Sequence, residues 1–360
     1  MSRILIDAYW LVNGPPSGKN VVRSLIDTWL DEFPMDQISL AMAIGDIAPA
    51  RAIIGHRAAN VEFVGLRAKP HGLSVFLEFN TRGYDAVLTQ NFAPFRGGSA
   101  RIGVFVHDVI YRRHPEWFSR VERMYLRFSL RTTRTADVVF TSSRAEGDQI
   151  SQLLSRRAMQ VVKPVGLGLS KEFDLAEPVQ PKGLPDVSRY YLTVGRLNAR
   201  KNVGFCAGAL LSEGLISPKV PLIVVGAPDG RGDSFADLQQ AVADGSVIFM
   251  GHVTDSELKW LYERTNLFIF PSLDEGFGLP ILEARTCGAR MLVSDIPAFR
   301  EVGPDAHFFD PRSARSIVRA VRQEEGVVKT EVQPVAKVET WPAVVTRIRG
   351  ALLLKSEENT

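Results

Sequence analysis

Short apolar runs alternate with segments of helical periodicity along the whole chain. The runs consist mainly of Val, Ile, Leu and Phe, which is typical of strands covered on both faces in a parallel sheet. In the first half the predicted strands are residues 4–7, 38–44, 61–64, 86–88, 102–106 and 138–141. In the second half they are residues 190–194, 222–225, 247–250, 267–270 and 291–293.

Between the runs, apolar residues recur every three or four positions, as they do in an amphipathic helix. The clearest example is the set Val22, Leu25, Ile26, Trp29, Leu30 and Phe33. Because strand and helix alternate in both halves, the sequence predicts the α/β class with two doubly wound parallel sheets. Sheets of this kind bind ligands at the carboxyl ends of their strands, so we expect a ligand cleft between two such domains.

The length of the chain sets the number of domains. With 360 residues it exceeds one typical core, and two domains of ~150–200 residues each are expected. The Pro-rich, polar stretch 169–188 is the predicted linker between a domain of residues 1–168 and a domain of residues 189–338. Residues 339–360 have the pattern of an amphipathic terminal helix.

The composition is that of a soluble globular protein, with 45% hydrophobic and 23% charged residues. The net charge of +3 is compatible with anionic ligands or lipid surfaces and selects neither. No apolar run approaches the ~20 residues that span a bilayer, and the first residues predict a strand rather than a signal peptide. Cys206 and Cys287 lie among small residues, as expected for buried thiols in a reducing cytoplasm rather than for metal ligands.

The segment 271–284 (PSLDEGFGLPILEA) carries the strongest chemical signal. It joins a predicted strand to a glycine turn and then to a helix that begins near Pro280. Unpaired amides and the positive end of the helix dipole converge at such a turn, which favours an anion. Glu275 and Glu283 flank it and offer carboxylates to hydroxyl groups. A ligand that binds the amides through its phosphates and the carboxylates through its hydroxyls fits the description of a nucleotide-sugar.

Basic residues follow the first strand of the second half. That strand ends at Gly195, and Arg196 and Lys201 come before the next predicted helix, where both suit a diphosphate. Gly226 ends another strand and lets the backbone approach a ligand. The backbone near Val253 follows a third strand and is placed to read a nucleobase edge. There is no Asp-x-Asp pair to hold a metal ion on a diphosphate, so no metal site and no cofactor are predicted.

Together these motifs resemble the donor-binding domain of retaining glycosyltransferases of family 4, which have the GT-B fold. The resemblance is close over residues 190–310 and looser in the first half. It implies two Rossmann-like domains facing an interdomain cleft, with residues 339–360 crossing back to the first domain and Trp341 as their anchor.

The resemblance also assigns roles to residues. Arg196 and Lys201 hold the donor's phosphates, Glu275 takes sugar hydroxyls and Glu283 takes ribose hydroxyls. The backbone amides that it assigns to phosphate or sugar are those of Phe277, Gly278 and Leu279.

The first half contributes two candidate segments. Residues 14–20 echo a P-loop, but the glycine spacing is one residue short and Asn20 replaces the hydroxyl that holds magnesium. By resemblance this loop lies against the donor phosphates and the acceptor, and Gly18 is the position that carries over. His107 and Asp108 end a predicted strand. The resemblance implies that His107 orients a sugar hydroxyl and that Asp108 orients His107 or touches the acceptor; a purely structural histidine is the alternative.

One predicted helix carries arginines at every third or fourth position, namely Arg120, Arg123, Arg127, Arg131 and Arg134. Two interpretations remain open. The stripe is either an ordinary solvated helix face, or a surface attracted to anionic lipid headgroups or to an acceptor pyrophosphate.

The resemblance implies a retaining glycosyltransferase that moves a sugar from a GDP- or UDP-sugar to a saccharide or polyprenyl-linked acceptor. Residues 106–118 look like the corresponding segment of mannosyl- or rhamnosyl-type members, so GDP-mannose is the leading donor. Exopolysaccharide or lipopolysaccharide assembly at the inner face of the plasma membrane fits this chemistry, and no nucleic-acid partner is expected. The alternatives are a nucleotide-sugar epimerase or a sugar phosphorylase of the same architecture, or a nucleotide-sugar-binding protein without catalysis.

Overall fold

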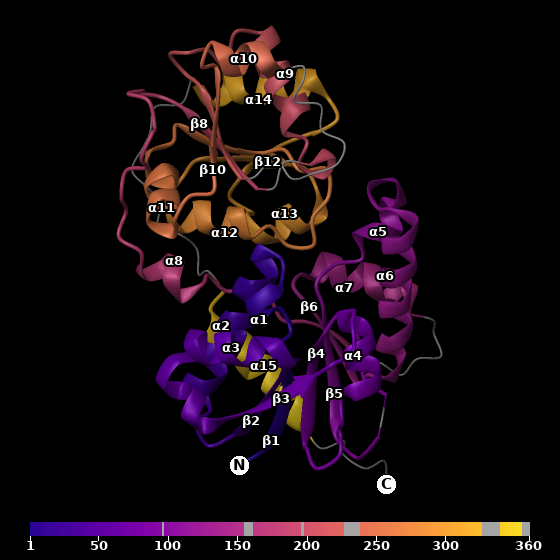
Figure 1. Cartoon of the computed structure of the whole chain (residues 1–360). Coiled ribbons are helices and arrows are strands. Elements are labelled where there is room, and N and C mark those ends of the chain that lie inside the picture. The colour runs from indigo at the N-terminus through magenta and orange to yellow at the C-terminus, as the bar shows by residue number, and fades with distance from the viewer. Residues whose placement is uncertain (96, 155–160, 196–197, 227–237, 326–338, 355–360) are drawn as a thin grey trace. The chain divides into compact units, whose positions relative to one another are not determined.

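The structure is a computed structural model that describes residues 1–95, 97–154, 161–195, 198–226, 238–325 and 339–354. The chain divides into two compact units (Figure 1). Unit 1 is Met1–Ser170 together with Glu339–Thr360, and unit 2 is Lys171–Val338. Each unit is built on one parallel sheet, so the predicted fold class, α/β with two parallel sheets, is confirmed.

Unit 1 has a seven-stranded sheet in the order β3-β2-β1-β4-β5-β6-β7. Its strands are β1 (Arg3–Asp7), β2 (Gln37–Ala43), β3 (Val61–Leu66), β4 (Ala86–Gln90), β5 (Arg101–Val106), β6 (Val138–Thr141) and β7 (Val161–Pro164). Its helices are α1 (Trp10–Asn13), α2 (Pro16–Glu32), α3 (Ile47–Ile54), α4 (His71–Glu78), α5 (Ile110–Arg113), α6 (Arg120–Thr132), α7 (Arg144–Leu153) and α15 (Trp341–Leu353). Short 3-10 turns include η3 (Pro115–Trp117) and η4 (Thr133–Thr135).

Unit 2 has a six-stranded sheet in the order β10-β9-β8-β11-β12-β13. Its strands are β8 (Tyr191–Val194), β9 (Leu222–Val225), β10 (Val247–Gly251), β11 (Leu267–Phe270), β12 (Met291–Ser294) and β13 (His307–Phe309). Its helices are α8 (Lys171–Leu175), α9 (Val203–Ser212), α10 (Gln239–Ala243), α11 (Asp255–Arg264), α12 (Leu279–Thr286), α13 (Pro297–Val302) and α14 (Ala314–Glu325). A 3-10 turn, η5 (Ala199–Lys201), follows β8.

Both sheets reverse their winding direction once. In unit 1 the chain adds strands on one side of β1 and then returns to place β4 on its other side. In unit 2 the same reversal separates β8 from β11. The loops that leave the two strands at such a point diverge and open a crevice at their carboxyl ends. Each unit is therefore expected to bind a ligand at the carboxyl ends of a strand pair, β1 and β4 in unit 1 and β8 and β11 in unit 2.

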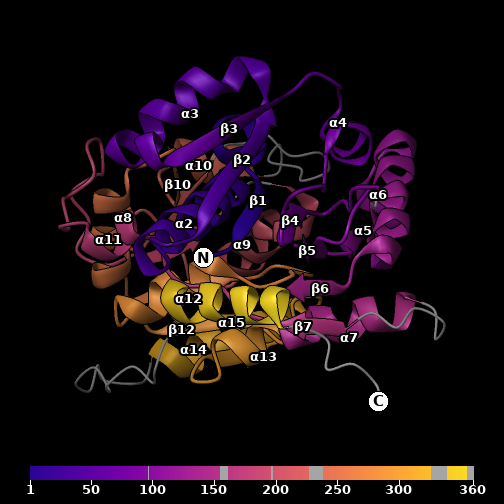
Figure 2. The same cartoon turned by 90° about the horizontal axis from the view of Figure 1, so that it is seen from below.

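Alternation along β5 shows how the sheet of unit 1 is covered. Ile102, Val104 and Val106 belong to a core cluster that includes apolar residues of α6 and α7. Gly103 points to the other face, where an added Cβ would lie 2.7 Å from Leu352 in α15. The terminal helix α15, yellow in Figures 1 and 2, thus packs within unit 1, against α2 and the strands β4 to β6.

A buried ion pair fastens α15. Arg349 donates two hydrogen bonds, of 2.7 and 2.9 Å, to the carboxylate of Asp36, which is only 8% exposed. Trp29 of α2 donates a third, of 3.2 Å, to the same group. Burial alone would raise the pKa of Asp36, but the bonds from Arg349 and Trp29 outweigh it and lower that pKa.

Aromatic residues pack one face of the unit 2 sheet. Phe268 and Phe270 of β11 stack at 5.6 Å between ring centroids, and Phe270 stacks on Phe299 of α13 at 5.1 Å. On the other face Leu267 and Ile269 join the core cluster that contains α9 and α14. Cys206 of α9 is buried in that cluster, and Cys287 is half-buried.

Several details differ from the sequence-based expectations. The edge strands β7 and β13 were not predicted, because β7 is largely exposed and β13 is only three residues long. Helix α11 begins at Asp255 and is capped by Thr254 through a capping box with Glu257. Within the described residues, no helix is long and apolar enough to cross a bilayer.

We expect Asp36→Asn to lower the free energy of unfolding by about 1–3 kcal/mol at pH 7, because the guanidinium of Arg349 loses its charged partner. Asp36 has a lowered pKa in the folded state, so its contribution is present above the ordinary carboxylate pKa and is lost as pH falls through the folded value. Urea titrations at pH 7 and at about pH 3 should therefore show a smaller difference between variant and wild type at the lower pH. Asp148→Asn, an exposed change on α7, is the control. A difference that does not shrink on acidification would contradict the assignment.

Candidate functional site

A single turn at the end of β8 presents two cations. Asn198 caps η5 by accepting the amide of Lys201 at 3.1 Å, and Asn202 ends the turn in the left-handed conformation, with φ of 56°. Gly195 just before it has φ of 142°, and an added Cβ there would lie 2.9 Å from Cε of Lys201. Glycine at this strand end is therefore needed both for its backbone conformation and to leave space for Lys201.

The two cations share one carboxylate. Lys201 Nζ lies 2.6 Å from Oε1 of Glu275, and Arg200 donates to Oε2 at 2.7 Å. Ser272 donates to Oε1 at 3.0 Å. The segment of Glu275 is also tied to η5 by its backbone, since the amide of Leu273 donates to the carbonyl of Arg200 at 2.8 Å. The β8 and β11 loops thus meet at the point where the winding direction reverses.

Electrostatics keep this cluster ionised. Burial alone would raise the pKa of Glu275, but Arg200 and Lys201 outweigh it and hold that pKa below its ordinary value. Lys201 Nζ also lies 4.6 Å from the ring centroid of Phe270, a cation–π geometry. Lys201 and Arg200 bring an ammonium group and a guanidinium group together at Glu275, and groups of this charge favour an anionic ligand.

The second glutamate lies eight residues further along the chain. Glu283 is in α12 and accepts a hydrogen bond of 3.0 Å from the hydroxyl of Tyr262 in α11. Burial raises the pKa of Glu283 to about 7, against the Tyr262 hydrogen bond, which lowers it. The two glutamates are therefore unlike: Glu275 is ionised at neutral pH, and Glu283 titrates there.

The start of α12 has the form expected of an anion-binding turn. Gly278 precedes the helix in the left-handed region, with φ of 106°, and an added Cβ would lie 2.9 Å from the ring of Phe299. Leu279 is the first helical residue, and Phe277 comes just before the cap. Amides of a first helical turn have no intrahelical acceptor, so this turn can donate hydrogen bonds to a ligand.

The other predicted residues of unit 2 lie at neighbouring strand ends. Gly226 follows β9 with φ of 144° and donates its amide to the carbonyl of Gly251 at 2.8 Å. Val253 lies between β10 and α11. Arg196 lies outside the described residues.

Unit 1 has a buried polar cluster at its own reversal point. Asp7 at the end of β1 is fully buried and accepts from Nε2 of His71 at 2.8 Å. The same carboxylate accepts the amides of Tyr9 at 3.0 Å and Gln90 at 3.1 Å. One carboxylate therefore links the carboxyl ends of β1 and β4 to the start of α4.

His107 is held beside this cluster, at the end of β5. Its Nε2 lies 2.8 Å from Oε1 of Gln90, and its amide donates to Asn91 at 3.1 Å. Burial lowers the pKa of His107 to about 4, so the imidazole is neutral at pH 7. Because the Gln90 oxygen can only accept, Nε2 carries the ring proton and Nδ1 is left as an acceptor.

The remaining predicted residues of unit 1 lie close to His107 in the chain or in space. Gly18 is in the first turn of α2, not in a loop, and an added Cβ would lie 2.7 Å from the ring of Trp10. The Trp10 and His107 rings are 5.1 Å apart, so Gly18 makes room for the tryptophan beside the histidine. The carboxylate of Asp108 accepts the amide of Ile110 at 3.2 Å.

Sequence reasoning missed four residues that shape these clusters, namely Arg200, Tyr262, Gln90 and His71. Arg200 stands next to Lys201, and a basic pair after a strand end was a usable signal. Gln90 is a polar residue that ends an apolar run, which was a second usable signal. The approach of Tyr262 to Glu283 and of His71 to Asp7 depends on helix packing that spacing does not reveal.

Comparison with solved structures gives the class of fold. The chain resembles a sucrose-phosphate synthase from Thermosynechococcus elongatus, with a TM-score of 0.67 and 16% identity over 98% of this chain and 94% of that chain. It also resembles Anabaena HepE in complex with UDP-glucose, with a TM-score of 0.63 and 18% identity over 98% and 96%. Identities this low establish the fold alone, and that fold is the GT-B fold of glycosyltransferases.

Comparison of sequences relates part of the chain to known glycosyltransferases. Residues 188–323, which lie in unit 2, match the family model described as Glycosyl transferases group 1. The O-antigen chain mannosyltransferase B of Escherichia coli is 28% identical over 60% of this chain and 59% of its own length. The O-antigen chain mannosyltransferase RfbU of Salmonella typhimurium is 28% identical over 61% and 60%. The matches span about 60% of the length of these relatives.

We expect Gln90→Glu to raise the pKa of His107 above its value of about 4, because a carboxylate beside Nε2 stabilises the imidazolium. Gln90→Leu, which removes the acceptor without adding charge, is the matched control. Nuclear magnetic resonance of the imidazole carbon-bound protons measures the pKa, with the signal assigned through His107→Ala. Identical titration of His107 in the two Gln90 variants would show that Gln90 does not face the ring as described.

Proposed function

We propose that this protein is a retaining glycosyltransferase that transfers mannose from GDP-mannose to a lipid-linked saccharide in lipopolysaccharide or exopolysaccharide assembly. The observation that carries the proposal is the cluster of Lys201, Arg200 and Glu275 at the β8/β11 reversal point, inside the segment that matches the glycosyltransferase family. The names of two relatives, both O-antigen chain mannosyltransferases, support the sugar and the pathway.

In this proposal the donor's diphosphate binds at the cluster of Lys201, Arg200 and Glu275. Lys201 and Arg196 contact its oxygens, and the amides of Phe277, Gly278 and Leu279 at the start of α12 donate to phosphate or sugar. The same contacts stabilise the negative charge that develops on the departing nucleoside diphosphate. Glu275, already held by Arg200, accepts hydrogen bonds from the mannose hydroxyls.

Glu283 and the neighbouring strand ends hold the nucleoside. The Glu283 carboxylate accepts from the ribose hydroxyls, and the backbone near Val253 and Gly226 contacts the base. A carboxylate with a pKa of about 7 gains most from hydroxyl donors in its ionised form, so ribose binding favours loss of its proton.

Unit 1 supplies the acceptor side. His107 is neutral, and with Nε2 protonated its Nδ1 accepts a hydrogen bond from a sugar hydroxyl. Asp108 follows His107 in the chain. The start of α2 around Gly18 packs against Trp10, and the Trp10 ring lies beside the His107 ring. We place the reaction at the inner face of the plasma membrane, where a lipid-linked acceptor is found. The cationic side chains and amides perform the neutralisation of the diphosphate, and no cofactor is invoked.

The proposal is tested by a thermal-shift screen of GDP-, UDP-, ADP- and dTDP-sugars. A ligand that binds only the folded state at 100 times its Kd stabilises that state by about 2.7 kcal/mol. We expect GDP-mannose to raise the Tm and Lys201→Ala to abolish the rise. Lys219→Ala, an exposed lysine at the amino end of β9, should leave the rise unchanged.

A Lys201→Ala protein that keeps the full GDP-mannose shift would sink the phosphate assignment. Conversion of GDP-mannose without an acceptor would favour an epimerase, and a requirement for inorganic phosphate would favour a phosphorylase.

The affinity for GDP-mannose should rise by up to about tenfold between pH 6 and pH 8, as Glu283, with its pKa of about 7, loses its proton. Both phosphates of GDP-mannose are diesters without an ionisation in this range, so the ligand adds no pH dependence of its own. Isothermal titration calorimetry at pH 6, 7 and 8 measures the effect, and Glu283→Gln should show a flat profile. A wild-type profile that is equally flat would refute a role for ionised Glu283 in binding.

A further inference from the structure

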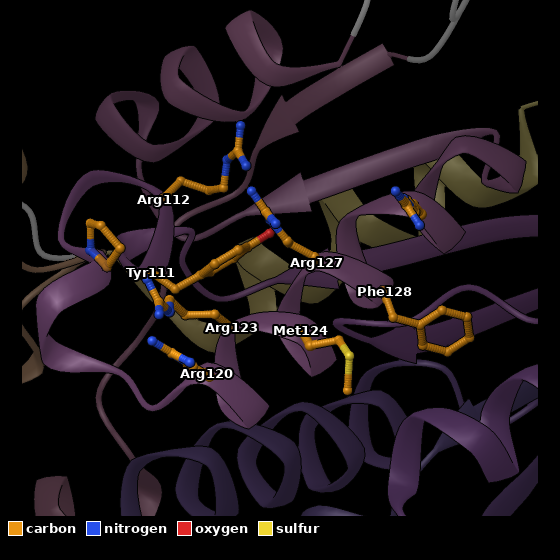
Figure 3. Close-up of a pocket in the computed structure, with 9 residues that line it drawn as sticks. Tyr111, Arg112, Arg120, Arg123, Met124, Arg127 and Phe128 are labelled. Carbon is orange, nitrogen blue, oxygen red and sulfur yellow. The ribbon is translucent and has the colours of Figure 1, made fainter.

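A concave pocket lies on unit 1, apart from the clusters described above (Figure 3). It has a volume of about 910 Å³ and is formed by α5, η3 and α6. Its lining residues are Tyr111, Arg112, Pro115, Arg120, Arg123, Met124, Arg127, Phe128 and Arg131. Helix α5 begins three residues after His107, so the pocket opens next to the carboxyl end of β5.

The arginines of this pocket concentrate positive charge on α5 and on one face of α6. The four from α6 follow one another at intervals of three or four residues and share one helix face. None of them, nor Arg112, forms an ion pair or a side-chain hydrogen bond with another described residue. Like charges at this spacing cost about 0.2–0.5 kcal/mol per pair, a cost that the folded chain carries with no visible structural return.

A buried hydroxyl group adds a neutral donor. Tyr111 is only 5% exposed, and its hydroxyl finds no hydrogen-bond partner among the described residues. In Figure 3 the hydroxyl points toward the side chain of Arg127. Burial raises the pKa of Tyr111 to about 12, against Arg112 and Arg127, which lower it, so the hydroxyl keeps its proton at neutral pH. An unpaired buried donor beside guanidinium groups is suited to an oxygen ligand with several lone pairs.

We propose that this pocket binds the diphosphate group of a prenyl-diphosphate-linked acceptor, an inference that rests on the proposed glycosyltransferase function. Arginine forks match phosphate oxygens in pairs, and five arginines exceed what a single carboxylate or monophosphate would need. Met124, 69% exposed on the same helix, offers an apolar surface to the prenyl chain.

The shape of the pocket separates this proposal from a general attraction to an anionic membrane. Surface attraction would use every arginine of α6 and η4 alike, including Arg134. Arg134 is exposed in η4 and does not line the pocket. A pocket for one diphosphate therefore depends on Arg123 and Arg127 but not on Arg134.

The test compares the binding of two ligands to variants of two sites, the pocket of unit 1 and the Lys201 cluster of unit 2. Binding of farnesyl diphosphate and of GDP-mannose is measured by titration calorimetry on the full chain. The double variant Arg123→Gln/Arg127→Gln should lower the affinity for farnesyl diphosphate at least about tenfold and leave the affinity for GDP-mannose within about twofold of the wild type. Tyr111→Phe, which removes only the hydroxyl, should lower the affinity for farnesyl diphosphate by about three- to tenfold. Arg134→Gln is the matched control and should change neither ligand.

Lys201→Ala should show the converse pattern: binding of GDP-mannose is lost and binding of farnesyl diphosphate is kept. Loss of farnesyl diphosphate in Lys201→Ala alone would overturn the pocket, because the ligand would then be using the site in unit 2. Full affinity of the double variant for farnesyl diphosphate would overturn it as well.

A vesicle assay separates the two sources of phosphate. The pocket proposal fails if two results are found together. The first is that Arg134→Gln and the double variant reduce co-sedimentation with phosphatidylglycerol vesicles equally, and the second is that farnesyl diphosphate binds the wild type no better than the double variant. The charge would then serve the membrane surface. If GDP-mannose fails to bind the wild type while farnesyl diphosphate binds as described, the donor assignment fails and the pocket stands.

Discussion

The buried carboxylate of Glu275 is the constraint from which the unit 2 site follows. A carboxylate removed from water is costly unless donors and cations replace its hydration, and here Lys201, Arg200 and Ser272 do so within 3.0 Å. Satisfying it requires the β8 and β11 loops to approach, which in turn requires Gly195 to leave room for the lysine stem. The result is a preorganised cluster of two cations around an ionised carboxylate at the point where the winding direction of the sheet reverses.

The reversal point of unit 1 is built on the opposite electrostatic principle. Its carboxylate, Asp7, accepts hydrogen bonds from two amides and lies against His71, while His107 at the end of β5 is kept neutral by burial. A neutral imidazole with a fixed proton can accept a hydrogen bond without adding charge. The same topology therefore carries a charged site in one unit and an uncharged polar site in the other.

The sequence predicted the strands and the strand ends well, because the runs in a parallel sheet are apolar on both faces and end in glycine or polar residues. It placed Lys201, Glu275 and Glu283 on the loops and helix where they lie. It could not show that Arg200 shares Glu275 or that Tyr262 reaches Glu283, since those contacts join residues 75 and 21 positions apart. Nor could periodicity find β7, whose residues are largely exposed at a sheet edge.

The arginines of unit 2 and of α6 differ in a way that bears on function. Arg200 is half-buried and forms an ion pair with Glu275, so its position is explained by the fold itself. Arg120, Arg123, Arg127 and Arg131 on α6 have no ion-pair partner among the described residues. Helix propensity alone would be served equally by neutral residues such as glutamine. Charge that the fold does not use, gathered around a buried hydroxyl, is better explained by a ligand than by stability. The resemblance of unit 2 to known glycosyltransferases does not extend to this argument, which depends on the geometry of α5 and α6 alone.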